Sequence, residues 1–229
     1  MQLSLHTSLK QIIYGGNDGI VTTFAIVAGF AGAQVDGMAE IGAAAVVLFG
    51  LANLMADALS MGMGEFLSAR SQHQLYWRDL REAEDGVHDN PAAATRSLAR
   101  RFEQQGLDPE AARTAATAFS HHPPLVARHL LEARGASMPD QEHPALNGAV
   151  TFLAFVIFGL LPILPYLLAL PAPLQWPLAI SNTALALLLL GMLRVKATAE
   201  PFRRAVGETL GVGGLCAFVA FGVGWMVGG

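Results

Sequence analysis

The stretch ANLMADALSMGMGEF, residues 52–66, carries four polar or sulfur-bearing side chains at intervals of four in an otherwise apolar segment: Asn53, Asp57, Met61 and Glu65. Residues four apart lie on one face of an α-helix. The spacing therefore predicts an apolar helix with a single polar stripe. Ionisable side chains are expensive inside a membrane and usually serve a function there, so we expect the activity of the protein to lie along this stripe.

The composition extends this prediction to the whole chain. Its mean hydropathy is +0.43, 53% of its residues are hydrophobic and only 14% are charged, whereas about a quarter of residues are charged in soluble domains. We therefore expect an integral membrane protein. The single cysteine, Cys216, excludes an intramolecular disulfide and a Cys-rich metal or redox motif.

No motif in the sequence predicts an enzyme. The chain has no H-E-x-x-H zinc signature, no nucleophile elbow and no base near Cys216 in the sequence. We expect no catalytic residues, no bound cofactor and no nucleic-acid partner.

Five segments are mostly apolar over about 20 residues, the length that crosses the hydrocarbon core of a bilayer. We therefore predict an all-α integral membrane protein with five transmembrane helices. Residues 1–69 hold the first two spans, residues 70–143 form a small helical module, and residues 144–229 hold the third to fifth spans. The predicted spans are approximately 11–33, 41–63, 145–170, 176–193 and 205–227.

The basic residues all lie on one side of this topology. Lys10 precedes the first span, nine arginines lie between residues 70 and 134, and the remaining four Lys and Arg residues lie in 194–204. Because Lys and Arg accumulate on the cytoplasmic side, we expect the N-terminus and the module in the cytoplasm and the C-terminus outside. We expect no cleavable signal peptide, because residues 1–11 are polar and lead into a full-length span.

Proline and glycine divide the module into helices. Proline favours the first position of a helix and glycine the end. No helix breaker occurs before Gly86, so the second transmembrane helix should continue into the module up to that point. The other predicted module helices are 91–106, 109–122 and 123–135.

A second polar intrusion, Asn17 and Asp18, interrupts the first span in GGNDGIVTTFAIVAGFAGA, residues 15–33. No Lys or Arg lies within a predicted span to neutralise Asp18 or Asp57. Each carboxylate must be protonated, hydrated or bound to a metal ion. Two helices with such groups favour a pathway for a cation.

The rise of an α-helix gives a first estimate of depth. At about 1.5 Å per residue, Asp18 lies about 12 Å beyond Lys10. Met61 lies about 13 Å before Arg70 on the same rise. We therefore expect Asp18 and Met61 at similar depth, with Asp57 deeper.

Met61 bears on the identity of the ion. A thioether among oxygen ligands shifts the preference toward first-row transition metals, and the spans lack the His or Cys ligands of a tight zinc site, so we expect Fe(II) or Mn(II). Structural roles are the alternatives: Met61 can fill a gap, Asn17 and Asn53 can join helices, Asp18 can cap a helix break, and Glu65 can be solvated at the helix exit.

The stretches GGNDGIVTTFAIVAGFAGA (15–33), ADALSMGMGEFLSARSQ (56–72) and GLLPILPYLL (159–168) make this chain resemble the vacuolar iron transporter family over nearly its whole length. The resemblance implies a homodimer that moves Fe(II), often also Mn(II), out of the cytoplasm in exchange for protons, with the pathway between the protomers. For a bacterial member it implies export across the cell membrane. Small residues four apart, Gly15 and Gly19 among them, offer weak local support for a dimer.

The resemblance also assigns residues. Asp18 matches the family's aspartate in the first span and Met61 its methionine in the second, and both handle metal there. Asn53 stands where plant and protist members have a glutamate. Asp57 and Glu65, on the same stripe, are our hypothesis for the groups that replace its charge.

The module departs from the family pattern of clustered glutamates that bind several metal ions. NPAAATRSL, residues 90–98, stands where further glutamates are expected. The candidates that remain are weaker: Glu82, Glu84, Asp85, His129 and Glu132.

The sequence thus predicts a metal exporter driven by proton antiport. A passive divalent-cation channel and a membrane-anchored metal sensor or storage protein are the alternatives.

Overall fold

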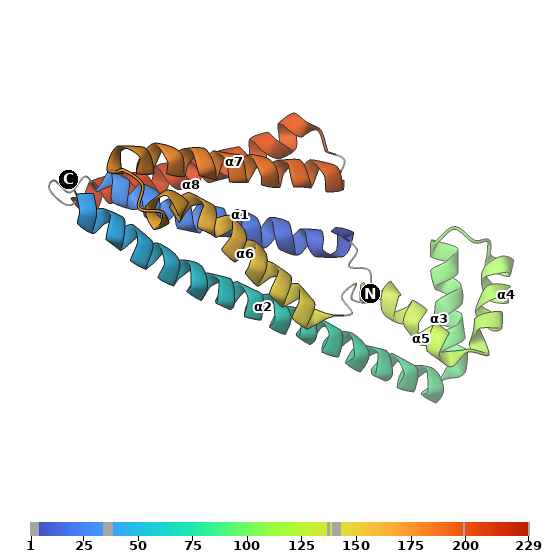
Figure 1. Ribbon diagram of the computed structural model, residues 1–229. Coiled ribbons are helices and arrows are strands. Elements are labelled where there is room, and N and C mark those ends of the chain that lie inside the picture. The colour runs from blue at the N-terminus through green and yellow to red at the C-terminus, as the bar shows by residue number, and fades with distance from the viewer. Residues whose placement is uncertain (1–4, 34–38, 137, 139–142, 199, 229) are drawn as a thin grey trace. The chain divides into compact units, whose positions relative to one another are not determined.

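The computed structural model describes residues 5–33, 39–136, 138, 143–198 and 200–228, and every element within these ranges is a helix (Figure 1). The prediction of an all-α fold is confirmed. In chain order the helices are α1 (Leu5–Gly32), α2 (Ala39–Asp89), α3 (Pro91–Gln104), α4 (Pro109–Ser120), α5 (Pro123–Ala133), α6 (Pro144–Leu167), α7 (Ala172–Thr198) and α8 (Phe202–Gly228).

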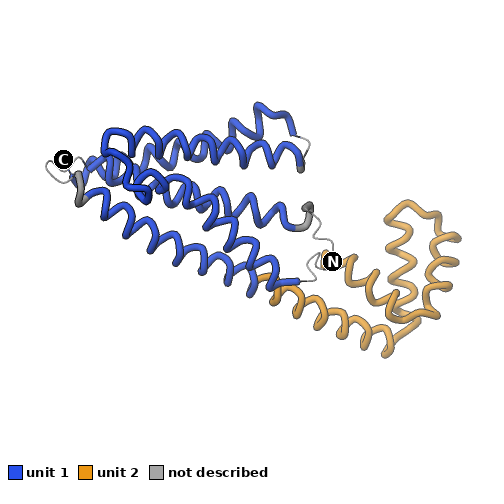
Figure 2. The backbone as a smooth tube through the Cα atoms, in the orientation of Figure 1, with its two compact units in different colours: residues 1–67, 143–229 blue, residues 68–142 orange. Residues whose placement is uncertain are grey.

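The helices form two compact units, coloured separately in Figure 2. The first unit comprises residues Met1–Leu67 and His143–Gly229, and the second comprises Ser68–Glu142. Helix α2 contributes residues to both units, because it runs without interruption for 51 residues.

Four helices of the described chain are long and apolar enough to cross a membrane, namely those that cover Gly42–Asp89, Pro144–Leu167, Ala172–Lys196 and Phe202–Gly228. These four support a membrane protein. Helix α1, which carries Asn17 and Asp18, is not among them, so the predicted count of five spans is not confirmed.

The packing of the first unit explains why α1 is less apolar. Helix α1 contacts α6, α7 and α8, and residues along its length, such as Ile20, Thr23 and Val27, are completely buried. By contrast, only 6% of the apolar window of α8 is buried. A helix that faces other helices does not need the uniformly apolar surface that lipid requires.

Glycines allow α1 and α6 to approach closely. A Cβ atom at Gly15 would lie 2.6 Å from the backbone oxygen of Thr151, and one at Gly19 would collide with the backbone of Phe155. Small residues at such contacts let helix backbones pack without the side chains between them. The first unit is therefore held together around a tight α1–α6 contact.

The second unit has a hydrophobic core of its own. Tyr76, Leu80, Ala83 and Val87 recur along one face of α2 and pack with buried residues of α3, α4 and α5. The predicted module helices agree with α3, α4 and α5 to within two residues. Their breaks lie where the sequence places glycine, because Gly106 and Gly135 have φ values of +105° and +86°, which favour glycine.

Gly86 does not end the helix as expected. Helix α2 continues to Asp89, since a glycine costs an exposed helix only about 1 kcal/mol and the next residue, Val87, is buried in the core of the second unit. The break occurs instead at Asn90, whose side chain accepts a hydrogen bond from the backbone N–H of Ala93 and caps α3.

Candidate metal-ion site

The contacts of α6 fix the depth of α1 against α2. A Cβ at Gly159 of α6 would meet Gly19 and Thr23 of α1 on one side and Leu54 of α2 on the other. Nearer the other end of α6, Gly148 meets Gly62 of α2. Residue numbers thus rise along α1 and fall along α2 as α6 advances, which shows that α1 and α2 are antiparallel.

This register brings Asp18 of α1 to the level of Asp57 of α2. On α1, Asp18 lies next to Gly19, toward the start of the helix. On α2, which runs the opposite way, Asp57 lies about one turn after Leu54 and so at the same level as Asp18. The two carboxyl groups are near enough for their charges to interact, and both side chains are half-buried. The predicted pair of aspartates therefore lies together on facing helices.

Each aspartate takes part in a hydrogen bond to a residue one turn away on its own helix. Nδ2 of Asn53 donates to Oδ2 of Asp57 at 2.6 Å, so the stripe amide orients the stripe carboxylate one turn away. On α1, the hydroxyl of Thr22 donates to the backbone oxygen of Asp18 at 2.8 Å. Three predicted residues, Asn53, Asp57 and Asp18, thus form one polar group.

Met61 does not lie at the level of Asp18 as expected. It is one turn, about 6 Å, farther along α2, half-buried and packed against the hydrophobic cluster that includes Leu54 and Phe155. The depth estimate was wrong because it took Lys10 and Arg70 as markers of one plane, whereas the contacts of α6 with Gly15 of α1 and with Gly62 of α2 set the register of the two helices.

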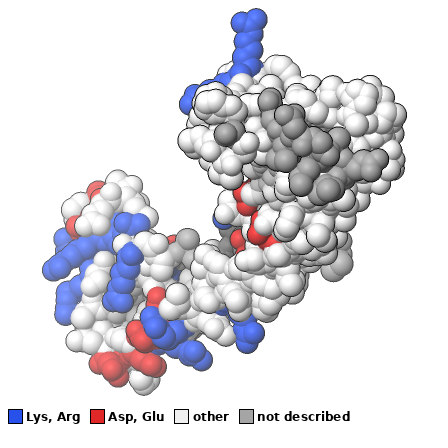
Figure 3. Space-filling model, turned by 90° about the vertical axis from the view of Figure 1, so that its left-hand side faces the viewer, with Lys and Arg blue, Asp and Glu red and all other residues white. Residues whose placement is uncertain are grey.

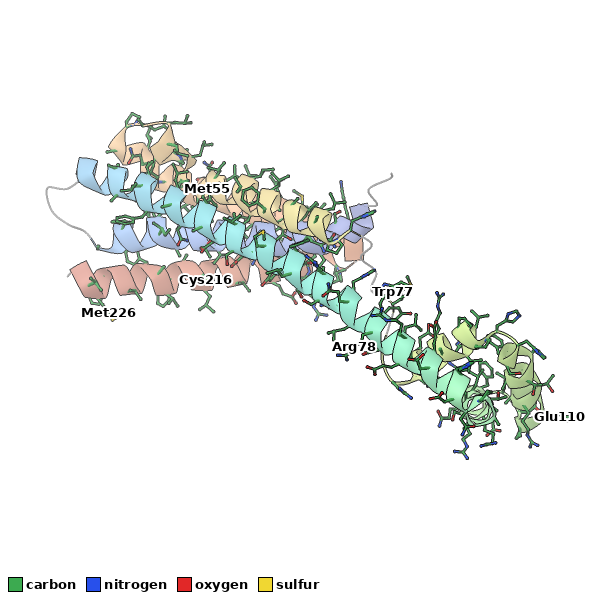
Figure 4. The ribbon with its side chains drawn as sticks, turned by 90° about the horizontal axis from the view of Figure 1, so that it is seen from below. Met55, Trp77, Arg78, Glu110, Cys216 and Met226 are labelled. Carbon is green, nitrogen blue, oxygen red and sulfur yellow. The ribbon has the colours of Figure 1, made fainter. Side chains whose placement is uncertain are left out.

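Burial distinguishes Met61 from its neighbours. Met55 and Met63 are each 48% exposed, and Met55, labelled in Figure 4, lines an apolar cavity beside the α6–α7 turn. Among these three methionines, Met61 alone lies on the half-buried stripe with Asn53, Asp57 and Glu65.

Glu65 lies at the far end of the stripe and has a partner that the sequence reasoning missed. Nε2 of Gln11 donates to Oε1 of Glu65 at 3.2 Å, and Gln11 is 98% buried with its own Oε1 in no hydrogen bond among the described residues. The signal was present, since Gln11 precedes Asp18 by seven residues and so shares its face of α1.

Asn17 is separated from Asp18. It lines a cavity of about 770 Å³ between α1, α7 and α8, together with Lys10, Tyr14, Arg194 and Glu208. Adjacent residues of a helix point about 100° apart, which explains why the two predicted neighbours face different surroundings.

The weaker candidates of the second unit do not gather into a centre. Glu82 is exposed and lies 3.7 Å from the guanidinium of Arg78, while Glu84 and Asp85 lie nearby on α2. His129 and Glu132 are 3.8 Å apart on α5. In the part of the chain that the structure describes, no three His, Cys, Asp or Glu side chains are placed to share a metal ion.

Charge differs between the two units. The nine arginines of residues 70–134 belong to the second unit, and the face drawn in Figure 3 shows Lys and Arg side chains gathered mainly there while the first unit is largely uncharged. The distribution fits a membrane-embedded first unit.

The small-residue motifs of α1 do not provide the dimer support that we expected from them. Gly15 and Gly19 meet α6 of the same chain, and Gly29 meets Gly224 of α8. These glycines are used in packing within one protomer, so they are no evidence for contact with a second copy.

Comparison with known proteins places this geometry in context. Residues 9–225 match the model of the VIT family. Vacuolar iron transporter 2 of Oryza sativa subsp. japonica is 29% identical to the chain, with 94% of the chain and 85% of the relative covered. The vacuolar iron transporter of Toxoplasma gondii is also 29% identical, with 94% and 73% covered. Vacuolar iron transporter 1 of Arabidopsis thaliana is 27% identical, with 93% and 83% covered.

Proposed function

Because this chain belongs to the VIT family, a membership that follows from the match over residues 9–225, we propose that it exports Fe(II) or Mn(II) from the cytoplasm in exchange for protons. Metal transport across a membrane is common to its relatives, which are named vacuolar iron transporters. The choice of ion, the direction and the proton coupling are our proposal.

The observation that carries it is the pair of carboxyl groups of Asp18 and Asp57. They come from two antiparallel helices, interact electrostatically and are half-buried in an apolar unit. Carboxylate oxygens can hold a proton, and they can also serve as ligands of a divalent cation. The pair is therefore suited to hold either protons or a divalent cation.

Competition for the same oxygens couples the two fluxes. A metal ion binds carboxylates only in their deprotonated form. Metal binding therefore releases protons, and the metal affinity decreases as the pH is lowered. Protons that reach Asp18 and Asp57 from outside would expel the metal ion, and the next ion from the cytoplasm would expel the protons.

The other stripe residues supply the approach to the pair. Glu65, oriented by Gln11, attracts the hydrated ion at the cytoplasmic end. Met61, one turn farther in, offers a thioether that favours Fe(II) or Mn(II) over Mg(II). Asn53 orients Asp57 and is a neutral ligand at the inner end of the stripe.

The topology belongs to the same proposal. Helix α1 also crosses the membrane, which brings the number of spans to five. The N-terminus and the second unit lie in the cytoplasm, and the C-terminus lies outside the cell membrane. A homodimer closes the pathway, because the stripe of α2 and the Asp18 face of α1 are only half-buried within one chain.

Purified protein in liposomes tests the proposal. Uptake of Fe(II), Mn(II), Co(II) and Zn(II) is measured with and without an imposed pH gradient, for the wild type, Asp18→Asn and a matched control, Asp89→Asn. Asp89 is exposed at the end of α2, so its variant should transport normally. Asp18→Asn should abolish metal-driven proton movement. Unchanged transport by Asp18→Asn would refute the proposed site, and flux that is independent of the pH gradient would indicate a passive channel.

A further inference from the structure

We propose that the cavity of about 770 Å³ between α1, α7 and α8 binds an anionic phospholipid of the cytoplasmic leaflet, with the phosphate at Lys10 and the glycerol esters at Asn17. This site is distinct from the pair of aspartates. It goes beyond the proposed transport function, although its assignment to the cytoplasmic leaflet follows the proposed topology.

Three helix faces build the cavity. On α1 its lining residues recur at positions 10, 13, 14 and 17, which is one helical face. Leu190 and Arg194 of α7, and Glu208 and Val212 of α8, are likewise four apart. The cavity therefore extends over about two turns of α1, from the charged end of the helix toward Asn17.

The lining combines charged, amide and apolar side chains, which together match the chemical parts of a phospholipid. Lys10 and Arg194 lie at the charged end, and Asn17 lies about 10 Å deeper along α1, where its amide can donate to an ester carbonyl. The remaining walls suit an acyl chain and comprise Leu9, Ile13, Leu190 and Val212.

The cavity is open to the outside of the unit. Tyr14 on one wall is 62% exposed and Val212 on another is 51% exposed. Both residues lie on helices whose outward faces would meet lipid, so an acyl chain can enter from the side.

The charge at this end favours an anion. The cavity lining contains two basic side chains, Lys10 and Arg194, and one acidic side chain, Glu208. Glu200 and Glu208 each lie 2.9 Å from the guanidinium of Arg194 and neutralise it, so Lys10 supplies the positive charge that an anion would meet. Among the described residues, no acidic side chain forms an ion pair with Lys10. Basic pockets between transmembrane helices are the usual binding sites for anionic headgroups.

Lipid binding to the purified full-length protein tests this assignment. Native mass spectrometry and thermal unfolding in neutral detergent compare phosphatidylglycerol with phosphatidylcholine of the same acyl chains, and inorganic phosphate is added as a competitor. We expect phosphatidylglycerol to bind more tightly and to raise the unfolding midpoint more. Equal binding of the two lipids would overturn the proposal, and so would displacement of phosphatidylglycerol by inorganic phosphate, which would indicate a site for the free anion.

Two pairs of variants locate the site. Lys10→Gln should weaken phosphatidylglycerol about fivefold, the factor expected for one basic residue at an anionic surface, while Arg203→Gln, an exposed charge that is not among the lining residues, should leave it unchanged. Val212→Trp should block binding by filling the cavity, whereas Val219→Trp, on the exposed surface of α8, should not. Equal effects within either pair would refute the site.

The measurement contains neither a transported metal nor a pH gradient. Failure of the transport proposal would therefore leave the lipid result intact, and a negative lipid result would leave the transport proposal intact.

Discussion

Replacing Gly15 by alanine is expected to destabilise the first unit through the close contact between α1 and α6. The new Cβ would lie 2.6 Å from the backbone oxygen of Thr151, where ordinary contact begins at 3.4 Å. A backbone oxygen cannot rotate away as a side chain can, so α1 and α6 must separate by about the difference, 0.8 Å. Overpacking of this kind typically costs about 1–3 kcal/mol.

The matched control is Gly211→Ala in α8, where a Cβ has nothing within 4 Å. Both substitutions gain the same helix propensity, about 1 kcal/mol, so their difference isolates the steric cost. Unfolding of the detergent-solubilised protein should place Gly15→Ala about 1–3 kcal/mol below Gly211→Ala. Transport should fall as well, because α1 carries Asp18 less than one turn away. Equal stability of the two variants would refute the α1–α6 register and the depth of Asp18 derived from it.

Three further outcomes are expected. Asp57→Asn should abolish transport as Asp18→Asn does, and wild-type flux would contradict the pairing of the two carboxyls. The Mn(II) dissociation constant of the wild type should rise as the pH is lowered, because the metal requires deprotonated carboxylates; an affinity independent of pH would exclude the carboxylates as ligands. Leu98→Ala should destabilise the second unit by about 2–5 kcal/mol, because Leu98 is completely buried, whereas Leu107→Ala, at a 40% exposed position, should cost little; near-ultraviolet circular dichroism compares the two, and similar melting would argue against the packed core.

The sequence predicted those features that depend on local signals. The starts of α3, α4 and α5 were located correctly because proline occupies the first position of each helix, whereas the end of α2 was misplaced because Gly86 does not interrupt it. The polar stripe of α2 was found because a spacing of four places residues on one face whatever the rest of the chain does.

Features that depend on how helices pack against one another were not predictable. The level of Asp18 against Asp57 is set by contacts of both helices with Gly159 of α6, and nothing in the spacing along α1 or α2 encodes it. The cavity that Asn17 lines has the same origin, because it depends on where α7 and α8 pack against α1.

The polarity of α1 and its enclosure by other helices have a consequence for biogenesis. The neighbours that enclose α1 are α6, α7 and α8, all of which leave the ribosome more than 100 residues after α1. Until they arrive, a nascent chain holds a marginally hydrophobic first segment with its aspartate unshielded, and late partners of this kind expose intermediates to misassembly. Products truncated before residue 144 should therefore be poor substrates for insertion and ready ones for quality-control proteolysis.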